Sequence, residues 1–167
     1  MSTPMQSKVV RLVAVVGAFA ILVIGALSIQ AALAITQART FTVVAPDAEQ
    51  KQIDLGQRGP SLGDLFVFSG PLQKRSGAEV GRIDGQCTTT SAPGPSAEQR
   101  QLCIVNATFE NTTPGAEIDT QGVGRVEAED VVLAVTGGTG LYQNARGQAT
   151  FDFRQEDRIV VTYELIP

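Results

Sequence analysis

The chain has 167 residues, 43% of them hydrophobic and 18% charged, which is typical of one ordinary globular domain rather than of a disordered chain. Its formal net charge of −4 provides no basic surface, so we expect no nucleic-acid partner. The chain contains no histidine, which excludes Ser-His-Asp and Cys-His catalytic sites and the usual zinc sites, and we expect neither a metal nor a cofactor.

The N-terminal segment is apolar and follows a positively charged start. Residues 12–29 contain no charged side chain, and Lys8 and Arg11 precede them. The small residues Ala32 and Ala34 fit the cleavage site of an export signal. The apolar run is also close to the roughly 20 residues that span a bilayer as a helix, so a retained membrane anchor is the alternative.

Both interpretations divide the chain in the same way. Residues 1–34 are expected to form a hydrophobic helix, either a signal peptide or a membrane anchor, and residues 35–167 the folded domain. The positive flank stays in the cytoplasm, so the domain is expected to lie outside it, secreted or anchored. Contact with the membrane is expected only through the N-terminal segment.

Beyond residue 34, short stretches alternate between apolar and polar residues, which is the period of a β-strand. Residues 46–60 and 91–99 are rich in turn formers and are predicted to be connections. No convincing amphipathic helix follows residue 34, so the pattern predicts an all-β antiparallel sandwich or barrel. The predicted strands are residues 39–44, 64–69, 79–90, 101–110, 117–126, 131–135, 148–153 and 158–166.

Residues 131–153 form the most distinctive stretch. A β-branched apolar run gives way to Gly137, Gly138 and Gly140, and alternation resumes at residue 148. Glycine enters positive φ without steric cost, so the stretch predicts a strand, a glycine-rich turn and a second strand. A phosphate-binding loop is the alternative, but no Gly-Lys-Ser/Thr follows, and Gln143 stands where a dinucleotide fingerprint needs its third glycine.

The chain has two cysteines, Cys87 and Cys103, which fall in successive predicted strands joined by one loop. In an exported domain, an even number of cysteines at such positions indicates a disulfide. Closing a loop of about 15 residues would stabilise the fold by roughly 3 kcal/mol. A reactive or ligand-binding thiol is the alternative, although no basic neighbour in sequence would lower its pKa.

Several short motifs together suggest a family. They are Ala-Val-Thr-Gly-Gly-Thr-Gly at 134–140, Ser-Leu-Gly-Asp-Leu at 61–65, Gly-Gln-Cys at 85–87, Gln-Gly at 121–122, Glu-Asp at 129–130 and Gly-Gln at 147–148. These motifs resemble those of the allene oxide cyclases and dirigent proteins, and the resemblance extends over residues 41–165. It implies an eight-stranded antiparallel β-barrel with an apolar cavity, often assembled as a homotrimer.

The resemblance also implies a function. It suggests a barrel that binds a small apolar or aromatic molecule and guides its isomerisation or cyclisation by shape. A non-catalytic barrel that serves as a binding or structural module at the envelope is the alternative. Plant allene oxide cyclases use a glutamate and an asparagine on the first strand, where this chain aligns Thr42 and Val44. We therefore do not expect authentic allene oxide cyclase activity.

Asp64 and Arg146 are the polar candidates for a catalytic role in the cavity. Each also has an ordinary interpretation, Asp64 as a cap at the start of a strand and Arg146 as half of an ion pair beside a turn. Glu129 and Asp130 are interpreted as a solvated strand start rather than as an acid/base pair. The aromatic candidates for ligand contact are Phe66, Phe68, Phe109 and Tyr163.

Overall fold

The computed structural model describes residues 39–56, 58–91, 98–126, 128–155 and 157–167. The predicted N-terminal helix and the predicted boundary at residue 34 lie outside these residues. Within them, no helix is long and apolar enough to cross a bilayer.

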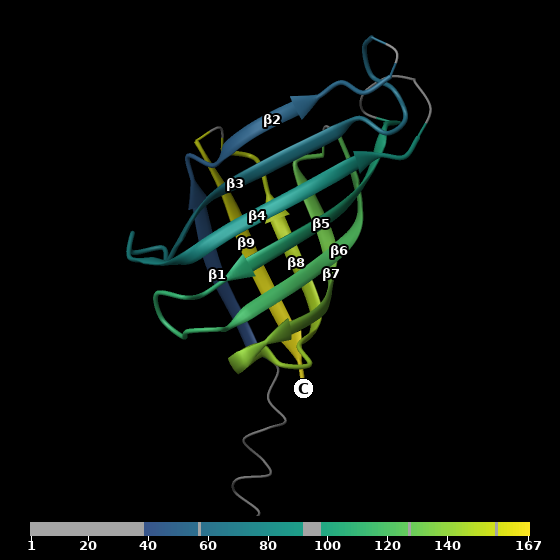
Figure 1. Cartoon of the computed structure of the whole chain (residues 1–167). Coiled ribbons are helices and arrows are strands. Elements are labelled where there is room, and N and C mark those ends of the chain that lie inside the picture. Colours follow the sequence, from purple (N-terminus) through teal and green to yellow (C-terminus); the bar gives the residue numbers. More distant parts are fainter. Residues whose placement is uncertain (1–38, 57, 92–97, 127, 156) are drawn as a thin grey trace, which may run out of the picture. The chain divides into compact units, whose positions relative to one another are not determined.

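The described part of the chain is built from β-strands and one short 3-10 helix, Gly140–Tyr142 (Figure 1). The strand bounds are β1 Arg39–Pro46, β2 Glu49–Ile53, β3 Leu65–Gln73, β4 Glu79–Thr89, β5 Arg100–Thr108, β6 Glu117–Arg125, β7 Asp130–Thr139, β8 Arg146–Asp152 and β9 Arg158–Ile166.

Eight of these strands close into an antiparallel barrel. The hydrogen-bonded order is β1-β9-β8-β7-β6-β5-β4-β3, and β1 also pairs with β3 through Val44 and Gln73. The pairing of β1 with β9 joins residues that lie far apart in sequence, such as Phe41 with Tyr163. The prediction of an all-β, eight-stranded antiparallel barrel is therefore confirmed.

The ninth strand, β2, was not expected. It follows β1 after a corner at Asp47, which has a φ of 47°, and it pairs with β3 from Glu49↔Ser69 to Ile53↔Leu65. The prediction that residues 46–60 form only a connection was wrong for this part. The first four residues of β2 are polar and show no apolar alternation, and only the pairing with β3 makes this segment a strand.

The predicted glycine-rich turn also lies differently from expectation. β7 continues through Gly137 and Gly138, which pair with Asp119 and Ile118, so the strand does not end at residue 135. A Cβ on Gly138 would lie 2.4 Å from the carbonyl oxygen of Glu117, which explains why only glycine fits there. The turn begins at Gly140, whose φ is 56°.

Inward and outward side chains alternate along the eight barrel strands, and the inward ones form the core. The buried core includes Val43, Ala45, Leu72, Ile83, Val105, Ala107, Ile118, Leu133, Val135, Ala149, Phe151, Val161 and Tyr163. The two ends of the barrel differ. The 3-10 helix lies at the end where β1 begins, here called the closed end, and the other end, where β7 begins, is here called the mouth.

Candidate ligand-binding site

A cavity of about 350 Å³ occupies the mouth half of the barrel. Exposed residues of several strands form its rim, and buried apolar residues form its walls, so it opens toward solvent. A volume of this size suits a small organic molecule. The described residues that line it are Gln50, Gln52, Phe66, Phe68, Cys87, Gln101, Cys103, Val105, Gly124, Arg125, Val126, Ala128, Val131, Leu133, Phe151, Phe153 and Ile159.

One wall of the cavity contains a disulfide. Cys87 on β4 and Cys103 on β5 are direct cross-strand partners, and their sulfurs are bonded. Both residues are buried and line the cavity. The predicted disulfide is confirmed. Neither sulfur is a free thiol, so no cysteine nucleophile is present in the described residues.

Phe68 on β3 owes its position to a glycine on β4. Gly85 is the cross-strand partner of Phe68, and a Cβ there would lie 2.2 Å from the Cζ atom of the phenylalanine ring. A larger residue at position 85 would therefore collide with this ring, and glycine leaves room for it. Phe66, two residues earlier, contacts Phe68 with ring centroids 5.8 Å apart. These two predicted ligand-contact residues both line the cavity.

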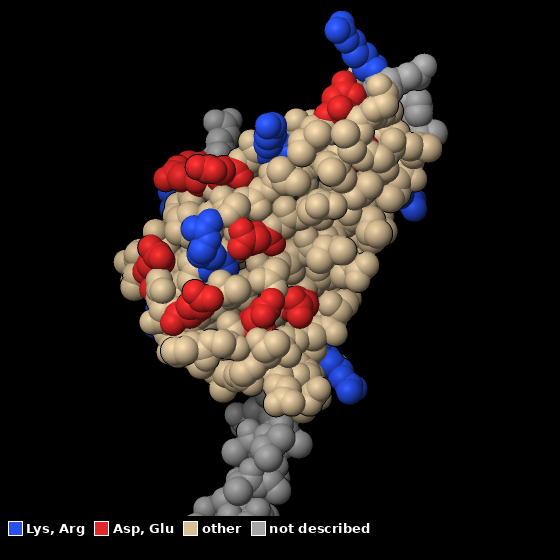
Figure 2. Space-filling view, in the orientation of Figure 1, with Lys and Arg blue, Asp and Glu red and all other residues tan. Residues whose placement is uncertain are grey.

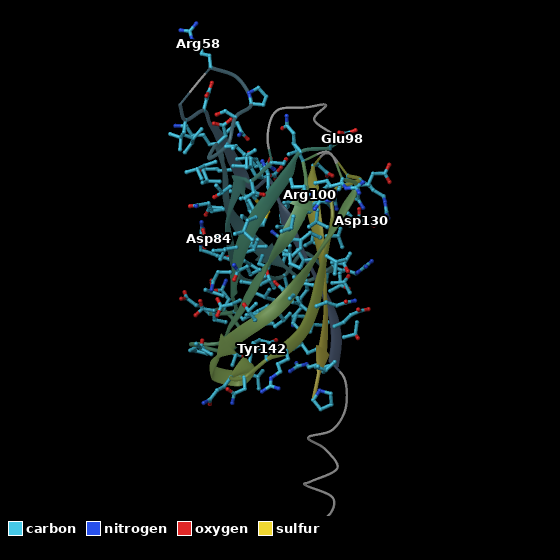
Figure 3. The ribbon with its side chains drawn as sticks, turned by 90° about the vertical axis from the view of Figure 1, so that its right-hand side faces the viewer. Arg58, Asp84, Glu98, Arg100, Asp130 and Tyr142 are labelled. Atoms are coloured by element: carbon cyan, nitrogen blue, oxygen red, sulfur yellow. A yellow bond between two sulfur atoms is a disulfide. The ribbon has the colours of Figure 1, made fainter. Side chains whose placement is uncertain are left out.

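The closed end is filled by aromatic rings. Phe41, Phe109, Tyr142 and Tyr163 form one cluster, in which Phe41 stacks on Tyr163 at 5.1 Å between centroids. Figure 3 shows Tyr142 at this end, with Glu98, Arg100 and Asp130 at the mouth. Phe109 and Tyr163 are therefore placed below the cavity and are not among its lining residues.

Burial controls the ionisation of the two tyrosines. Burial raises the pKa of Tyr163 far above its usual value, and the nearby Tyr142 adds to the effect. Burial also raises the pKa of Tyr142, against the opposing charge of Arg39, whose guanidinium lies 5.7 Å from that ring. Both hydroxyls stay protonated at neutral pH, so neither tyrosine acts as a base there.

Polar side chains gather at the rim. Three amides, Gln50, Gln52 and Gln101, line the cavity beside its apolar walls. Gln101 lies 3.5 Å from the Thr89 hydroxyl, to which its amide nitrogen can donate. Arg125, exposed at the end of β6, is the one charged residue among the described residues that line the cavity. The site therefore offers an apolar interior with hydrogen-bonding groups at its opening.

Asp64 lies outside the cavity lining, in the connection before β3. Its carboxylate accepts hydrogen bonds from the backbone N–H of Leu55 at 2.9 Å and of Ser61 at 2.6 Å, and from the Ser61 hydroxyl at 3.0 Å. The Leu55 and Ser61 N–H groups hold the pKa of the Asp64 carboxyl below its usual value. The structure thus places Asp64 as a buried anchor of the β2–β3 connection.

The other polar candidates also lie apart from the cavity. Arg146 is exposed at the start of β8, at the closed end. The exposed Arg154 forms salt bridges with Asp130 at 2.9 Å and with Glu129 at 3.4 Å. In the described residues, no cluster of three or more His, Cys, Asp or Glu side chains could hold a metal ion.

The first strand presents no polar group to the barrel interior. Its buried positions are Val43 and Ala45, and Phe41 packs against the core. Thr42 and Val44 alternate with these residues and point outward, where the Thr42 hydroxyl contacts that of Thr162 at 3.1 Å. The inward positions are therefore one residue away from those aligned by sequence, and they too contain no carboxylate or amide.

A second hollow of about 290 Å³ adjoins the first. Gln50, Phe153 and Ile159 line both spaces, so these side chains stand between them. The remaining described lining residues of the second hollow are Ala45, Asp47, Ala48, Gln155, Asp157 and Arg158. Asp157 is engaged by Arg158, whose Nε donates to it at 3.0 Å.

Sequence reasoning missed most of the rim. Gln50 and Gln52 were placed in a connection, although their spacing of two residues is that of a strand facing one side. Gln101 was assigned to a strand but given no role. An exposed phenylalanine, Phe153, was also missed as a lining residue, although it is 39% exposed at the mouth.

Comparisons with known proteins agree with this geometry. A profile of the family described as Dirigent-like protein matches residues 29–166. No curated protein matches the chain.

Among solved structures, a pyocyanin demethylase is similar at 26% identity and a TM-score of 0.65, covering 76% of this chain and 99% of that chain. The Diels-Alderase AbmU from Streptomyces koyangensis is similar at 18% identity and a TM-score of 0.61, covering 100% of this chain and 84% of that chain. A pterocarpan synthase dirigent protein is similar at 17% identity and a TM-score of 0.57, covering 78% and 87%. At such identities the last two show the fold alone.

Proposed function

The chain belongs to the dirigent-like protein family, and from that premise we propose that it binds a small apolar or aromatic molecule in the mouth cavity and guides its isomerisation or cyclisation by shape. The observation that carries the proposal is the open cavity of about 350 Å³ with apolar walls and a few amides at its rim.

The proposed mechanism relies on positioning. The described residues that line the cavity include no carboxylate, free thiol or histidine, so proton transfer by a side chain has no obvious agent there. Holding a flexible substrate in a reactive conformer can by itself accelerate a reaction, because the entropy of alignment is lost on binding rather than in the transition state. Phe66, Phe68 and Phe151 would provide the surfaces that select the conformer.

The names of two of the three similar structures fit this proposal, whereas the pyocyanin demethylase is named for a different reaction. One similar structure is a Diels-Alderase and another a pterocarpan synthase dirigent protein. Both names refer to the formation of ring systems. The alternative, a barrel that serves as a non-catalytic envelope module, predicts an interior packed solid with phenylalanine, whereas Phe66, Phe68 and Phe151 here border an open space.

The test is to block the cavity. Val131 lines the mouth at the start of β7, and Val131→Phe should fill part of the opening. Val160 points outward on β9, so Val160→Phe is a matched control with the same added volume. Molecules that co-purify with the native protein would be identified by mass spectrometry. We expect Val131→Phe to lose them and Val160→Phe to retain them; equal retention by both would contradict the proposal.

We also propose that the domain is exported, held at or released from the membrane through residues 1–34. The Cys87–Cys103 disulfide supports this location, because disulfides persist in oxidising compartments and are rare in the cytosol of mesophiles. Reporter fusions placed after residue 60 should be active only in an exported form. Activity of a cytoplasmic reporter at that position would overturn the proposal, and the mass of the mature protein would decide between cleavage and anchoring.

Assembly into a homotrimer is a further part of the proposal, taken from the family resemblance. The outer face of β5, β6 and β7 supports self-association. Exposed apolar residues lie side by side on it, with Ile104 and Val123 each more than half exposed. Figure 2 shows a broad area without charged side chains on the side of the barrel that these strands form. Sedimentation equilibrium would measure the oligomeric state.

A further inference from the structure

Two of the polar residues at the cavity rim lie on one strand. Gln50 and Gln52 alternate on β2, opposite Phe68 and Phe66 of β3. Residues of a strand spaced by two face the same side, so both glutamines lie on the face that carries the cavity-lining phenylalanines. Both also line the cavity. β2 thus presents two amides to whatever occupies the space.

These two amides are available for a ligand. Neither side chain hydrogen-bonds to another described residue, and both glutamines are exposed. A glutamine amide offers two donors and an acceptor without a net charge. It therefore suits a carbonyl or hydroxyl group better than an ionised group, which would need a counter-charge when removed from water.

The rest of the cavity gives an ionised group little support. The walls below the rim are apolar, and the one charged lining residue among those described, Arg125, lies exposed at the end of β6. A ligand that enters the apolar space with its oxygen substituent toward β2 buries its ring and keeps its polar group hydrogen-bonded. A charged substituent in the same position would lose hydration without a paired ion.

We infer that Gln50 and Gln52 are specificity-determining residues, which make the cavity select uncharged ring compounds that carry a carbonyl or hydroxyl oxygen. This inference rests on the proposed function and names the substrate class and the residues that recognise it. Gln50 also borders the second hollow, so substituents beyond that oxygen extend into it.

β2 is an edge strand, so ligand binding to it can be followed by hydrogen exchange of its backbone amides. In the described residues it pairs with β3 alone, so one of its edges lacks a strand partner. A ligand held by Gln50 and Gln52 would stabilise this edge strand. Its backbone amides should therefore exchange with solvent more slowly when a recognised ligand is bound.

The experiment uses four naphthalene probes: naphthalene, 2-acetylnaphthalene, 2-naphthoate and (2-naphthyl)methylammonium. The chain contains no tryptophan, so naphthalene fluorescence can be followed directly. Binding would be measured at pH 7 with the protein in the form that accumulates in its producing cells. We expect the uncharged ketone to bind tightest and to slow the amide exchange of β2, which naphthalene should not do.

The variants are Gln50→Leu, Gln52→Leu and the double variant, with Gln86→Leu as a control on the outer face of β4. Losing one hydrogen bond should weaken ketone binding about three- to tenfold while leaving naphthalene binding unchanged. Gln86→Leu should change neither. Circular dichroism would check that each variant remains folded.

Two results would overturn the inference while leaving the proposed function intact. One is an equal loss of naphthalene and ketone binding in the glutamine variants, which would make these residues simple walls. The other is a preference for 2-naphthoate that survives in the double variant, which would assign recognition to Arg125. Failure of all four probes to bind would instead contradict the proposed function, and the inference with it.

Discussion

Cys87 and Cys103 face each other across β4 and β5, and the disulfide between them forms part of the cavity wall. The same bond therefore joins neighbouring strands and contributes two polarisable sulfurs to the surface that a ligand would touch. This one covalent link therefore contributes both to the stability of the barrel and to the shape of its binding space.

Removing the disulfide should destabilise the barrel. The cysteines are 16 residues apart, and for a loop of this size the chain-entropy model gives about 3 kcal/mol. We expect the Cys87→Ala/Cys103→Ala variant to lose roughly that much free energy of unfolding in urea titrations. Thiol titration of the unfolded, unreduced wild type should find no free thiol; two reactive thiols would contradict the prediction.

Gly85→Ala should disturb the cavity. The new methyl group would meet the Phe68 ring at 2.2 Å, so the ring must move into the space that it now borders. We expect a loss of about 1–3 kcal/mol in stability, typical of an overpacked core, together with weaker probe binding.

Gly137→Ala is the matched control for that substitution. Gly137 lies in β7, where a Cβ would have the Asp119 carboxylate at 3.7 Å as its nearest neighbour, an ordinary contact. Its stability should change by no more than about 0.5 kcal/mol. Equal effects of the two substitutions would show that the Phe68–Gly85 contact is unimportant.

Asp64 should make stability depend on pH in the acid range. Its folded pKa is lowered from 3.8, chiefly by the Leu55 N–H and then by the Ser61 N–H. A lowered folded pKa gives stability that is present above the unfolded value and is lost as pH falls through the folded one. We expect Asp64→Asn to be less stable than wild type at pH 7, with the difference shrinking below about pH 4.

The urea midpoint at pH 7 and at pH 3 would measure the Asp64 effect. Glu110→Gln, a change at an exposed carboxylate in the turn after β5, is the control and should show no such dependence. Loss of probe binding by Asp64→Asn without loss of stability would instead assign Asp64 a role at the cavity.

The protein should not act as an authentic allene oxide cyclase. The inward positions of β1 are Phe41, Val43 and Ala45, none of which can polarise an epoxide. Loss of one preorganised charge-stabilising group typically costs about 3 kcal/mol, or about a hundredfold in rate. A chiral product assay with the fatty-acid allene oxide should give racemic product. Stereospecific cyclisation well above the spontaneous background would show this inference to be wrong.

The sequence by itself determined the strands whose pattern is local. Alternation of apolar and polar residues predicted the strands that became β4, β5, β6 and β9. The reason is that every second side chain of a strand faces the core. The disulfide was also predictable, because Cys87 and Cys103 lie on successive strands joined by one loop. Both kinds of information are contained within a short length of chain.

Only the tertiary structure decided what depends on distant parts of the chain. Residues 49–52 are polar, and the segment 49–53 becomes a strand only through β3. The barrel closes by joining β1 to β9, where Thr42 meets Thr162 across 120 residues of sequence. Gly85 on β4 leaves room for the ring of Phe68 on β3, which is one of the residues that line the cavity. The cavity is lined by side chains from separate strands, and the residue pattern along any one strand cannot predict which of them come together.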